Sequence, residues 1–295
     1  MVNTEAACKL IREEETRPPS GIMNENWDNL IILDACRFDF FQEENSIQGE
    51  LHTKISGGSQ SWEFMNHYFI SETYHDTVYV TANPHAVRIP DGVFHSIENR
   101  LNDWDMSYEV VLPQAMVDAA IDAHNRYPNK RLIVHFMQPH TPWLGQTAEW
   151  IRNNFDVKGN NKNHGKNLLG KDVDDPRSGS EGFFTLPKEG KISLAAVRQS
   201  YRETLNIVLD SVSSLIDQIE GRSVITSDHG EMLGERAGTR RVYGHPPNLW
   251  TEEVRVIPWL EIPGTERGTV AEEPLEREDV DQEVVQRQLD ALGYT

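Results

Sequence analysis

The stretch at residues 222–245, RSVITSDHGEMLGERAGTRRVYGH, decides the fold. Its first part, residues 223–226, is a short β-branched run typical of a buried parallel strand. The run gives way to Asp228, His229 and Gly230, so a carboxylate and an imidazole stand where the strand stops. Ligands of open α/β sheets bind at the carboxyl ends of the strands. We therefore expect Asp228 and His229 to be metal ligands, with the alternative that Asp228 caps a helix and His229 is an ordinary surface histidine.

A second apolar run, NLIIL at residues 29–33, also stops at a carboxylate, Asp34. This pattern predicts a parallel strand that delivers Asp34 to the same edge of the sheet as Asp228. The helix expected next begins near Arg37 and Asp39. Arg37 could reach an anionic substrate group, and Asp39 could pair with Arg37 or cap the helix.

A glycine- and serine-rich turn, ISGGSQS at residues 55–61, precedes a predicted helix at Trp62. Backbone amides at such a turn favour a phosphate or sulfate group. A serine there is a candidate nucleophile if a metal lowers its pKa. Ser61 is the first candidate, Ser59 the second and Ser56 the third; the simpler alternative is that Ser61 only caps the helix.

The remaining strands and helices alternate along the chain. Residues 77–80 and 131–136 read as strands, and the second of these leads to His135 and His140. Residues 113–127 and 193–220 carry apolar side chains at helical spacing, which predicts two helices. Residues 254–262 are predicted to form an edge strand. His245 is a candidate third ligand beside Asp228 and His229. The pattern predicts an α/β fold, a doubly wound and mostly parallel sheet with helices on both faces.

Composition limits the function. The chain has 295 residues and a formal net charge of −19, which argues against nucleic-acid binding because phosphate backbones need clustered Lys and Arg. The same acidity suits a salt-rich cytoplasm, which predicts a halophilic protein. Two cysteines give neither a disulfide framework nor a zinc spacing, and no apolar window is long enough to span a membrane or act as a signal, so we expect a cytoplasmic location.

The chain divides into three parts by composition. Residues 1–25 form a charged leader, residues 26–263 the catalytic domain, and residues 264–295 an acidic tail with a short helix at 280–292. Within the domain, residues 144–191 are polar and predict a mobile lid or an inserted substrate loop. This segment carries six of the nine lysines: Lys158, Lys162, Lys166, Lys171, Lys188 and Lys191.

Four motifs, in order along residues 28–262, resemble those of the alkaline phosphatase and sulfatase superfamily. They are LIILDACRFD, the segment GSQSW, HFMQPHTPW, and SDHGEMLGE followed by YGH. In overall look the chain is most similar to sulfatase-like proteins of haloarchaea. The resemblance implies that Asp34, Asp228 and His229 bind a divalent metal and that Ser61 is the nucleophile. His135, His140 and His245 would bind substrate, protonate the leaving group or hold a second metal; we expect catalytic roles for Ser61, Arg37, His140 and His245, and substrate contacts from Ser59 and His135.

Two departures from the sulfatase pattern favour phosphate chemistry. The Cys-x-Pro-x-Arg segment of true sulfatases is absent, and Ala35 stands where a second Asp is usual. Imidazole ligands favour zinc or manganese, with calcium or magnesium as alternatives. We therefore expect a hydrolase acting on a phosphoester or phosphodiester more readily than on a sulfate ester, with an anionic small molecule, glycan or lipid ester as substrate. The alternatives are a transferase that moves a phospho-group or head group onto a glycan or lipid, and a catalytically silent binding domain.

The acidic composition generates a first prediction. Salt should raise the melting temperature, because it screens repulsion among surface carboxylates. Thermal unfolding in low and in molar potassium chloride measures this effect. An unchanged melting temperature would contradict the halophile hypothesis.

Overall fold

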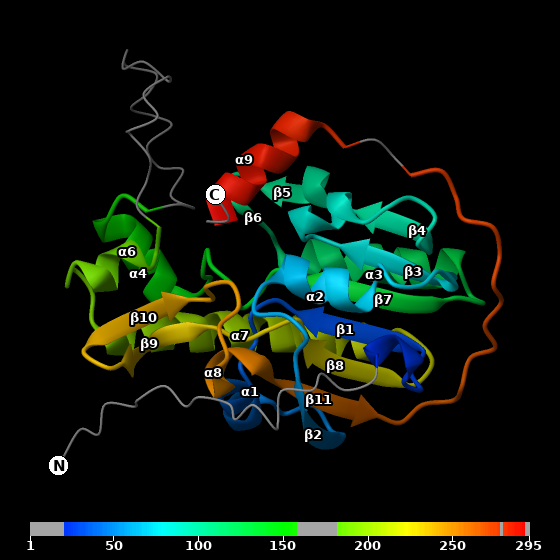
Figure 1. Cartoon of the computed structure of the whole chain (residues 1–295), viewed down its shortest axis with the longest axis horizontal. Helices are drawn as coiled ribbons and strands as arrows, with labels where there is room; N and C mark the ends of the chain where they lie inside the picture. The colour runs from blue at the N-terminus through cyan, green and yellow to red at the C-terminus, as the bar shows by residue number, and fades with distance from the viewer. Residues whose placement is uncertain (1–20, 158–181, 278–279, 293–295) are drawn as a thin grey trace.

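A seven-stranded mixed sheet is the frame of the protein. The computed structural model describes residues 21–157, 182–277 and 280–292. The strands lie in the order β2-β11-β8-β1-β7-β3-β4, and only β11 runs antiparallel to its neighbours (Figure 1). Their bounds are β1 Asn29–Leu33, β2 Glu50–Ile55, β3 Tyr74–Thr81, β4 Phe94–Asn99, β7 Arg131–Phe136, β8 Ser223–Ser227 and β11 Val256–Ile262. The predicted mostly parallel, doubly wound sheet is confirmed.

The central strand β1 explains why both faces of the sheet are covered. All five of its residues are buried. Ile31 and Leu33 pack into one hydrophobic cluster, and Leu30 and Ile32 into the other, because successive side chains of a strand point to opposite faces. A strand buried on both sides is largely apolar, as are the four residues of β1 that follow Asn29.

Helices cover each face of this sheet. The longest, α7 (Leu194–Ile216), shares one cluster with α1 (Phe38–Glu44), α3 (Pro113–Arg126) and α4 (Gln146–Asn154). The opposite cluster includes α2 (Ser61–Tyr68) and the 3₁₀ helix η3 (Pro84–Arg88). Ser193 caps α7 by accepting a hydrogen bond from Ala196 N at 3.1 Å. The remaining helices are η2 (Ile22–Asn24), η4 (Leu101–Asp103), α6 (Thr185–Lys188), α8 (Glu252–Arg255) and α9 (Gln282–Leu292). Within the described residues no helix is long and apolar enough to cross a membrane.

The prediction of residues 254–262 as an edge strand was wrong. β11 lies between β8 and β2, and four of its residues in succession are buried. The edges are β2 and β4, which the sequence did not predict, because edge strands need not be apolar and β2 is largely polar and partly exposed. Two small sheets were also missed, β5 (Trp104–Asp105) with β6 (Val110–Val111) and the hairpin of β9 (Met232–Ala237) with β10 (Arg240–Gly244).

The chain after β11 returns across the molecule. Its backbone amides donate hydrogen bonds from Val270 to Asn129 O and from Leu275 to His95 O. Helix α9 then lies on the same side of the molecule as β5 (Figure 1) and is tied there by a hydrogen bond from Gln288 Nε2 to Leu101 O. The expected acidic tail is therefore packed on the domain within its described part.

Two expected segments lie partly outside the described residues. Of the predicted leader, residues 1–20 lie outside. The predicted lid is described only at its ends, where α4 and α6 form, and its residues 158–181 with four of the six lysines lie outside.

Candidate active site and metal centre

The register of the central strands brings three expected ligands together. Leu33, the last residue of β1, pairs with Ser227, the last residue of β8, so Asp34 and Asp228 leave the sheet side by side. Both carboxylates and the imidazole of His229 are completely buried. One ligand atom of each of these three residues lies within 4.8 Å of the others.

The two oxygens of Asp34 have different surroundings. Oδ2 accepts hydrogen bonds from Asn83 Nδ2 at 2.8 Å and from Ser61 Oγ at 3.2 Å. Oδ1 has no hydrogen-bond partner in the described part of the chain and lies 3.7 Å from His229 Nε2. A buried carboxylate oxygen without a donor is costly, and a cation would satisfy it.

Asp228 repeats this arrangement. Its Oδ1 accepts hydrogen bonds from the backbone amides of His229 at 2.8 Å and Ala35 at 3.1 Å. Oδ2 lacks a hydrogen bond from any residue that the structure describes, and it lies 3.4 Å from His229 Nε2. His229 Nδ1 is 2.9 Å from Gly230 O, and because a carbonyl only accepts, we assign the proton to Nδ1. The lone pair of Nε2 then faces both carboxylates.

Electrostatics make the same cluster a cation site. Burial raises the pKa of Asp34, and the negative charge of Asp228 raises it further. Burial lowers the pKa of His229, so the imidazole is neutral and able to ligate at neutral pH. Two buried carboxylates and a neutral imidazole are a donor set that could hold a divalent cation.

A second group of ligand types adjoins the first. His140, Glu231 and His245 also bring one ligand atom each within 4.8 Å. The ring centroids of His229 and His245 are 4.4 Å apart, so the two groups are neighbours. Neither carboxylate oxygen of Glu231 has a hydrogen-bond partner among the described residues, and burial raises the pKa of this side chain well above its usual range. The sequence analysis missed Glu231, which follows His229 by two residues.

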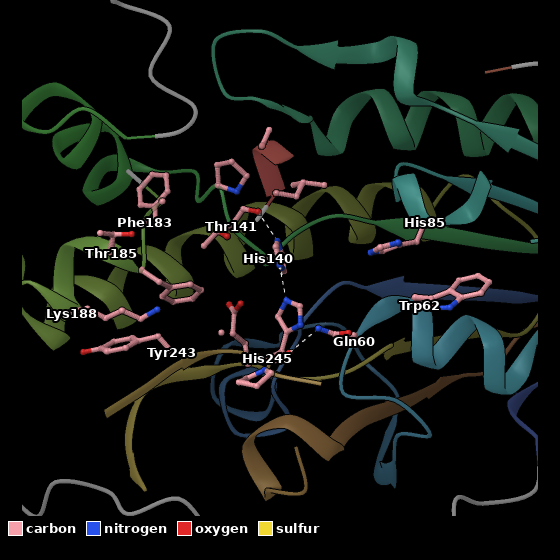
Figure 2. Close-up of a pocket in the computed structure, with 18 of the residues that line it drawn as sticks. Gln60, Trp62, His85, His140, Thr141, Phe183, Thr185, Lys188, Tyr243 and His245 are labelled. Carbon is pink, nitrogen blue, oxygen red and sulfur yellow. Dashed lines mark hydrogen bonds between the residues drawn. The ribbon is translucent and has the colours of Figure 1, made fainter. Parts of the chain in front are cut away.

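The two histidines of the second group contact one another. Their Nε2 atoms are 2.9 Å apart, as the dashed line between His140 and His245 in Figure 2 marks. His140 Nδ1 lies 2.6 Å from Thr141 O and therefore carries a proton, so Nε2 of His140 accepts and Nε2 of His245 donates. Burial lowers the pKa of His140 to about 4, which keeps it neutral at pH 7.

The three candidate serines are separated by their contacts. Only the hydroxyl of Ser61 contacts the metal-ligand group, at 3.2 Å from Asp34 Oδ2 and 3.4 Å from His229 Nε2. Ser59 Oγ instead donates to Glu63 Oε2 at 2.9 Å, and Ser56 Oγ donates to the backbone carbonyl of Asp228. The expected substrate contact of Ser59 finds no support in this geometry, because its hydroxyl is used to hold the turn and the start of α2.

Two further expected site residues act behind the centre. His135 lies within β7, completely buried; its Nδ1 is 2.8 Å from the hydroxyl of Tyr79 and its Nε2 is 3.7 Å from Asp228 Oδ2. It can orient Asp228 but does not line the cavity described below, contrary to the expected substrate contact.

Arg37 is also turned away from that cavity. Its guanidinium forms ion pairs with Asp39 at 2.6 Å and Glu235 at 2.7 Å and donates to the carbonyl of Glu231 at 3.2 Å. These partners occupy its donors, so the expected direct catalytic role is replaced by support of the loop that carries Glu231.

A cavity of about 520 Å³ opens onto the second group. His140, Glu231 and His245 line it, together with His85 and Arg88 of η3. Figure 2 shows His85 and Trp62 on one side of the two central histidines, and Lys188 and Tyr243 on the other. The residues at 83–85 follow strand β3 at the same sheet edge, and the sequence analysis assigned them no role.

Together, the sheet and the site define an α/β protein with two adjoining groups of metal-ligand types beside a serine. Its structural neighbours are phosphoethanolamine transferase and sulfatase domains of the alkaline phosphatase superfamily.

The soluble domain of lipooligosaccharide phosphoethanolamine transferase A from Neisseria meningitidis is 12% identical, with 87% of this chain and 80% of that chain covered and a TM-score of 0.45. The periplasmic domain of EcEptC from Escherichia coli, in complex with Zn, is 14% identical, with 86% and 77% covered and a TM-score of 0.47. A 2-O GAG sulfatase is 12% identical, with 91% and 70% covered and a TM-score of 0.46. Likenesses at this level do not transfer an activity.

No protein-family model matches the sequence, and no curated protein matches it. The expected likeness to haloarchaeal proteins in particular finds no support in these comparisons.

The unsatisfied oxygen of Asp228 leads to a prediction about metal binding. Asp228→Asn should lower metal affinity by about 100-fold or more, because an amide is a poorer ligand than a carboxylate. The metal-free variant should remain folded, since the change also removes a like charge beside Asp34. Elemental analysis after dialysis, with circular dichroism, measures both effects. Asp210→Asn, at an exposed position of α7, is the control; equal metal content in Asp228→Asn and wild type would contradict the assignment.

His85 leads to a prediction about pH. Burial, with the nearby charge of Arg88, lowers its pKa from 6.5 to about 4. As the pH falls, the imidazole of His85 is therefore protonated in the unfolded chain before it is protonated in the folded protein. The free energy of unfolding is highest above pH 6.5, and it decreases as the pH falls toward 4. The loss is on the order of 3 kcal/mol for His85. Urea unfolding of chelator-treated protein between pH 7 and 4 should give a shallower pH dependence for His85→Gln than for wild type. Identical slopes would contradict the prediction.

Proposed function

We propose that the protein is a metal-dependent enzyme that cleaves phosphate esters with Ser61 as the nucleophile. The observation that carries this proposal is the position of the Ser61 hydroxyl, which alone among the three candidate serines contacts both Asp34 and His229. Ser61 is completely buried, and its neighbours in the chain, Gln60 and Trp62, line the cavity. A serine in contact with metal-ligand groups is a suitable acceptor for a phosphoryl group.

The reaction has two steps. In the first, Ser61 Oγ forms a bond to phosphorus as the ester bond to the leaving alcohol breaks, and the proton lost by Ser61 is balanced by the proton that the departing oxygen gains. In the second, water or an acceptor alcohol attacks the phosphoserine, and Ser61 recovers its proton as the phosphoryl group leaves. A divalent metal held by Asp34, Asp228 and His229 would lower the pKa of the serine hydroxyl and offset charge on the transferred group.

His140 and His245 are the proposed partners of the leaving group. Both line the cavity, and Nε2 of His245 carries the proton that it donates to Nε2 of His140. Such a donor can pass a proton to the departing oxygen and take one from the incoming water or alcohol. These histidines, with Glu231, are also the residues that would hold a second metal.

The preference for phosphate over sulfate esters rests on the sequence. Cys36 is a buried residue of the loop that follows β1, and the Cys-x-Pro-x-Arg segment of true sulfatases is absent. A glycan or lipid ester is the proposed substrate, and a cytoplasmic location and salt tolerance remain parts of the proposal.

Transfer to an alcohol is the second candidate. The open cavity beside the histidines has room for an acceptor in place of water. An acceptor alcohol that speeds product release more than water does would favour transfer. A silent binding domain is the other alternative, and the contact of Ser61 with the candidate metal ligands Asp34 and His229 favours an enzyme over it.

Replacing the nucleophile tests the proposal. Ser61→Ala should lower kcat/KM on aryl phosphates or aryl phosphodiesters by about a thousandfold or more, while bound metal persists. Ser59→Ala is the matched control in the same turn and should retain most activity. Aryl sulfates and chelator-treated protein complete the assay. Full activity of Ser61→Ala, or cleavage confined to sulfates, would contradict the proposal.

A further inference from the structure

The cavity extends on both sides of the two histidines proposed to act on the leaving group. His140 and His245 lie in its middle, with Trp62 and His85 to one side and Lys188 and Tyr243 to the other (Figure 2). A phosphate monoester carries one organic substituent, whereas a diester carries two. A cavity with two arms therefore has a place for each substituent of a diester.

Apart from the metal proposed above, the centre provides no cation for a second charge on the transferred group, because the cationic residues that line the cavity, Arg88 and Lys188, lie to either side of His140 and His245. Asp34, Asp228 and Glu231 are carboxylates, and the nearby guanidinium groups of Arg37 and Arg255 do not line the cavity. Arg37 is paired as described above, and Arg255 donates to the carbonyls of Leu249 at 2.9 Å and Ser56 at 3.2 Å. At neutral pH a monoester is largely dianionic and a diester monoanionic, so this environment favours the diester.

One arm carries an oriented cation. The guanidinium carbon of Arg88 lies 4.0 Å from the centroid of the Trp62 ring, a cation–π contact that fixes its direction. Most other arginines of the described residues bind carboxylates or carbonyls. Arg88, in contrast, forms no ion pair with an acidic residue in the described part of the chain. In a chain of net charge −19 such a cation beside a reacting centre is a place for an anionic group.

The position of Arg88 is built into the fold. Arg277, from the chain after β11, donates to the carbonyls of Ala86 at 2.7 Å and Ile89 at 2.9 Å. These bonds fix η3, which carries both His85 and Arg88. The charges of Arg88 and Asp228 both act on His85, so the arm lies within electrostatic reach of the centre.

We propose that the substrate is a phosphodiester with one substituent in each arm, and that Arg88, stacked on Trp62, binds an anionic group on one substituent. The inference rests on the proposed function and adds its substrate class. It makes Arg88 a specificity-determining residue outside the catalytic centre.

A charge series tests this inference. The probes are p-nitrophenyl phosphodiesters whose second alcohol is 3-hydroxypropionate, ethanol or ethanolamine, with p-nitrophenyl phosphate as the monoester. Wild type should cleave each diester faster than the monoester and should favour the carboxylate over the ammonium substituent. Arg88→Glu should reverse that preference, with a change in the ratio of kcat/KM values of about fivefold or more, as expected for an exposed charge pair.

Two control variants make the outcome decisive. Arg88→Lys should keep the preference for the carboxylate, and Arg240→Glu, at an exposed position outside the cavity, should leave it unchanged. The ratio of two substrates within one variant does not depend on the fraction of active protein. Faster cleavage of the monoester, or the same ratio in wild type and Arg88→Glu, would overturn the inference. No cleavage of any ester by metal-loaded wild type would instead overturn the proposed function.

Discussion

The repulsion between two buried carboxylates is the constraint on which the site depends. Asp34 and Asp228 are forced together because β1 and β8 are adjacent parallel strands that end at the same level. Each directs one oxygen toward His229 that no described residue satisfies with a hydrogen bond. Such an arrangement is unfavourable without a cation and becomes favourable with one. The register of β1 and β8 therefore creates a candidate cation site.

The scaffold holds this arrangement with ordinary hydrogen bonds. Ser227 Oγ donates to Leu33 O at 2.7 Å and accepts from Cys36 N at 2.9 Å, which joins the ends of β8 and β1. The hydroxyl of Tyr201, on α7, donates to Ala35 O at 2.7 Å. Ala35 has a φ of 59°, a conformation that costs energy for a residue other than glycine, and these bonds fix it. The long helix thus connects the apolar core to the metal-ligand loop.

The fold and the first ligand group could be predicted because they follow from short-range patterns. A buried apolar strand that ends at an acid, as at Asp34 and Asp228, predicts both a central place in a parallel sheet and a carboxylate at the edge of that sheet where ligands bind. The strands β2 and β4 were missed since their place at the edges depends on their neighbours and not on their own apolar pattern. The ion pair of Arg37 with Glu235 could not be predicted, because Glu235 is distant in sequence and lies in the hairpin of β9 and β10. Without that partner, Arg37 was predicted to contact substrate. Glu231 and His85 were not predicted as site residues, because turns of the chain after β8 and β3 decide where their side chains lie.

The most direct test of the central claim is to trap the covalent intermediate. Metal-loaded protein would be mixed with an aryl phosphodiester, quenched in acid within the first turnover, digested and examined by mass spectrometry. A phosphoester group on the peptide that contains Ser61, absent from Ser61→Ala, is the predicted result. Turnover with no modified peptide, or modification at another residue, would contradict the role of Ser61 and with it the account of the site.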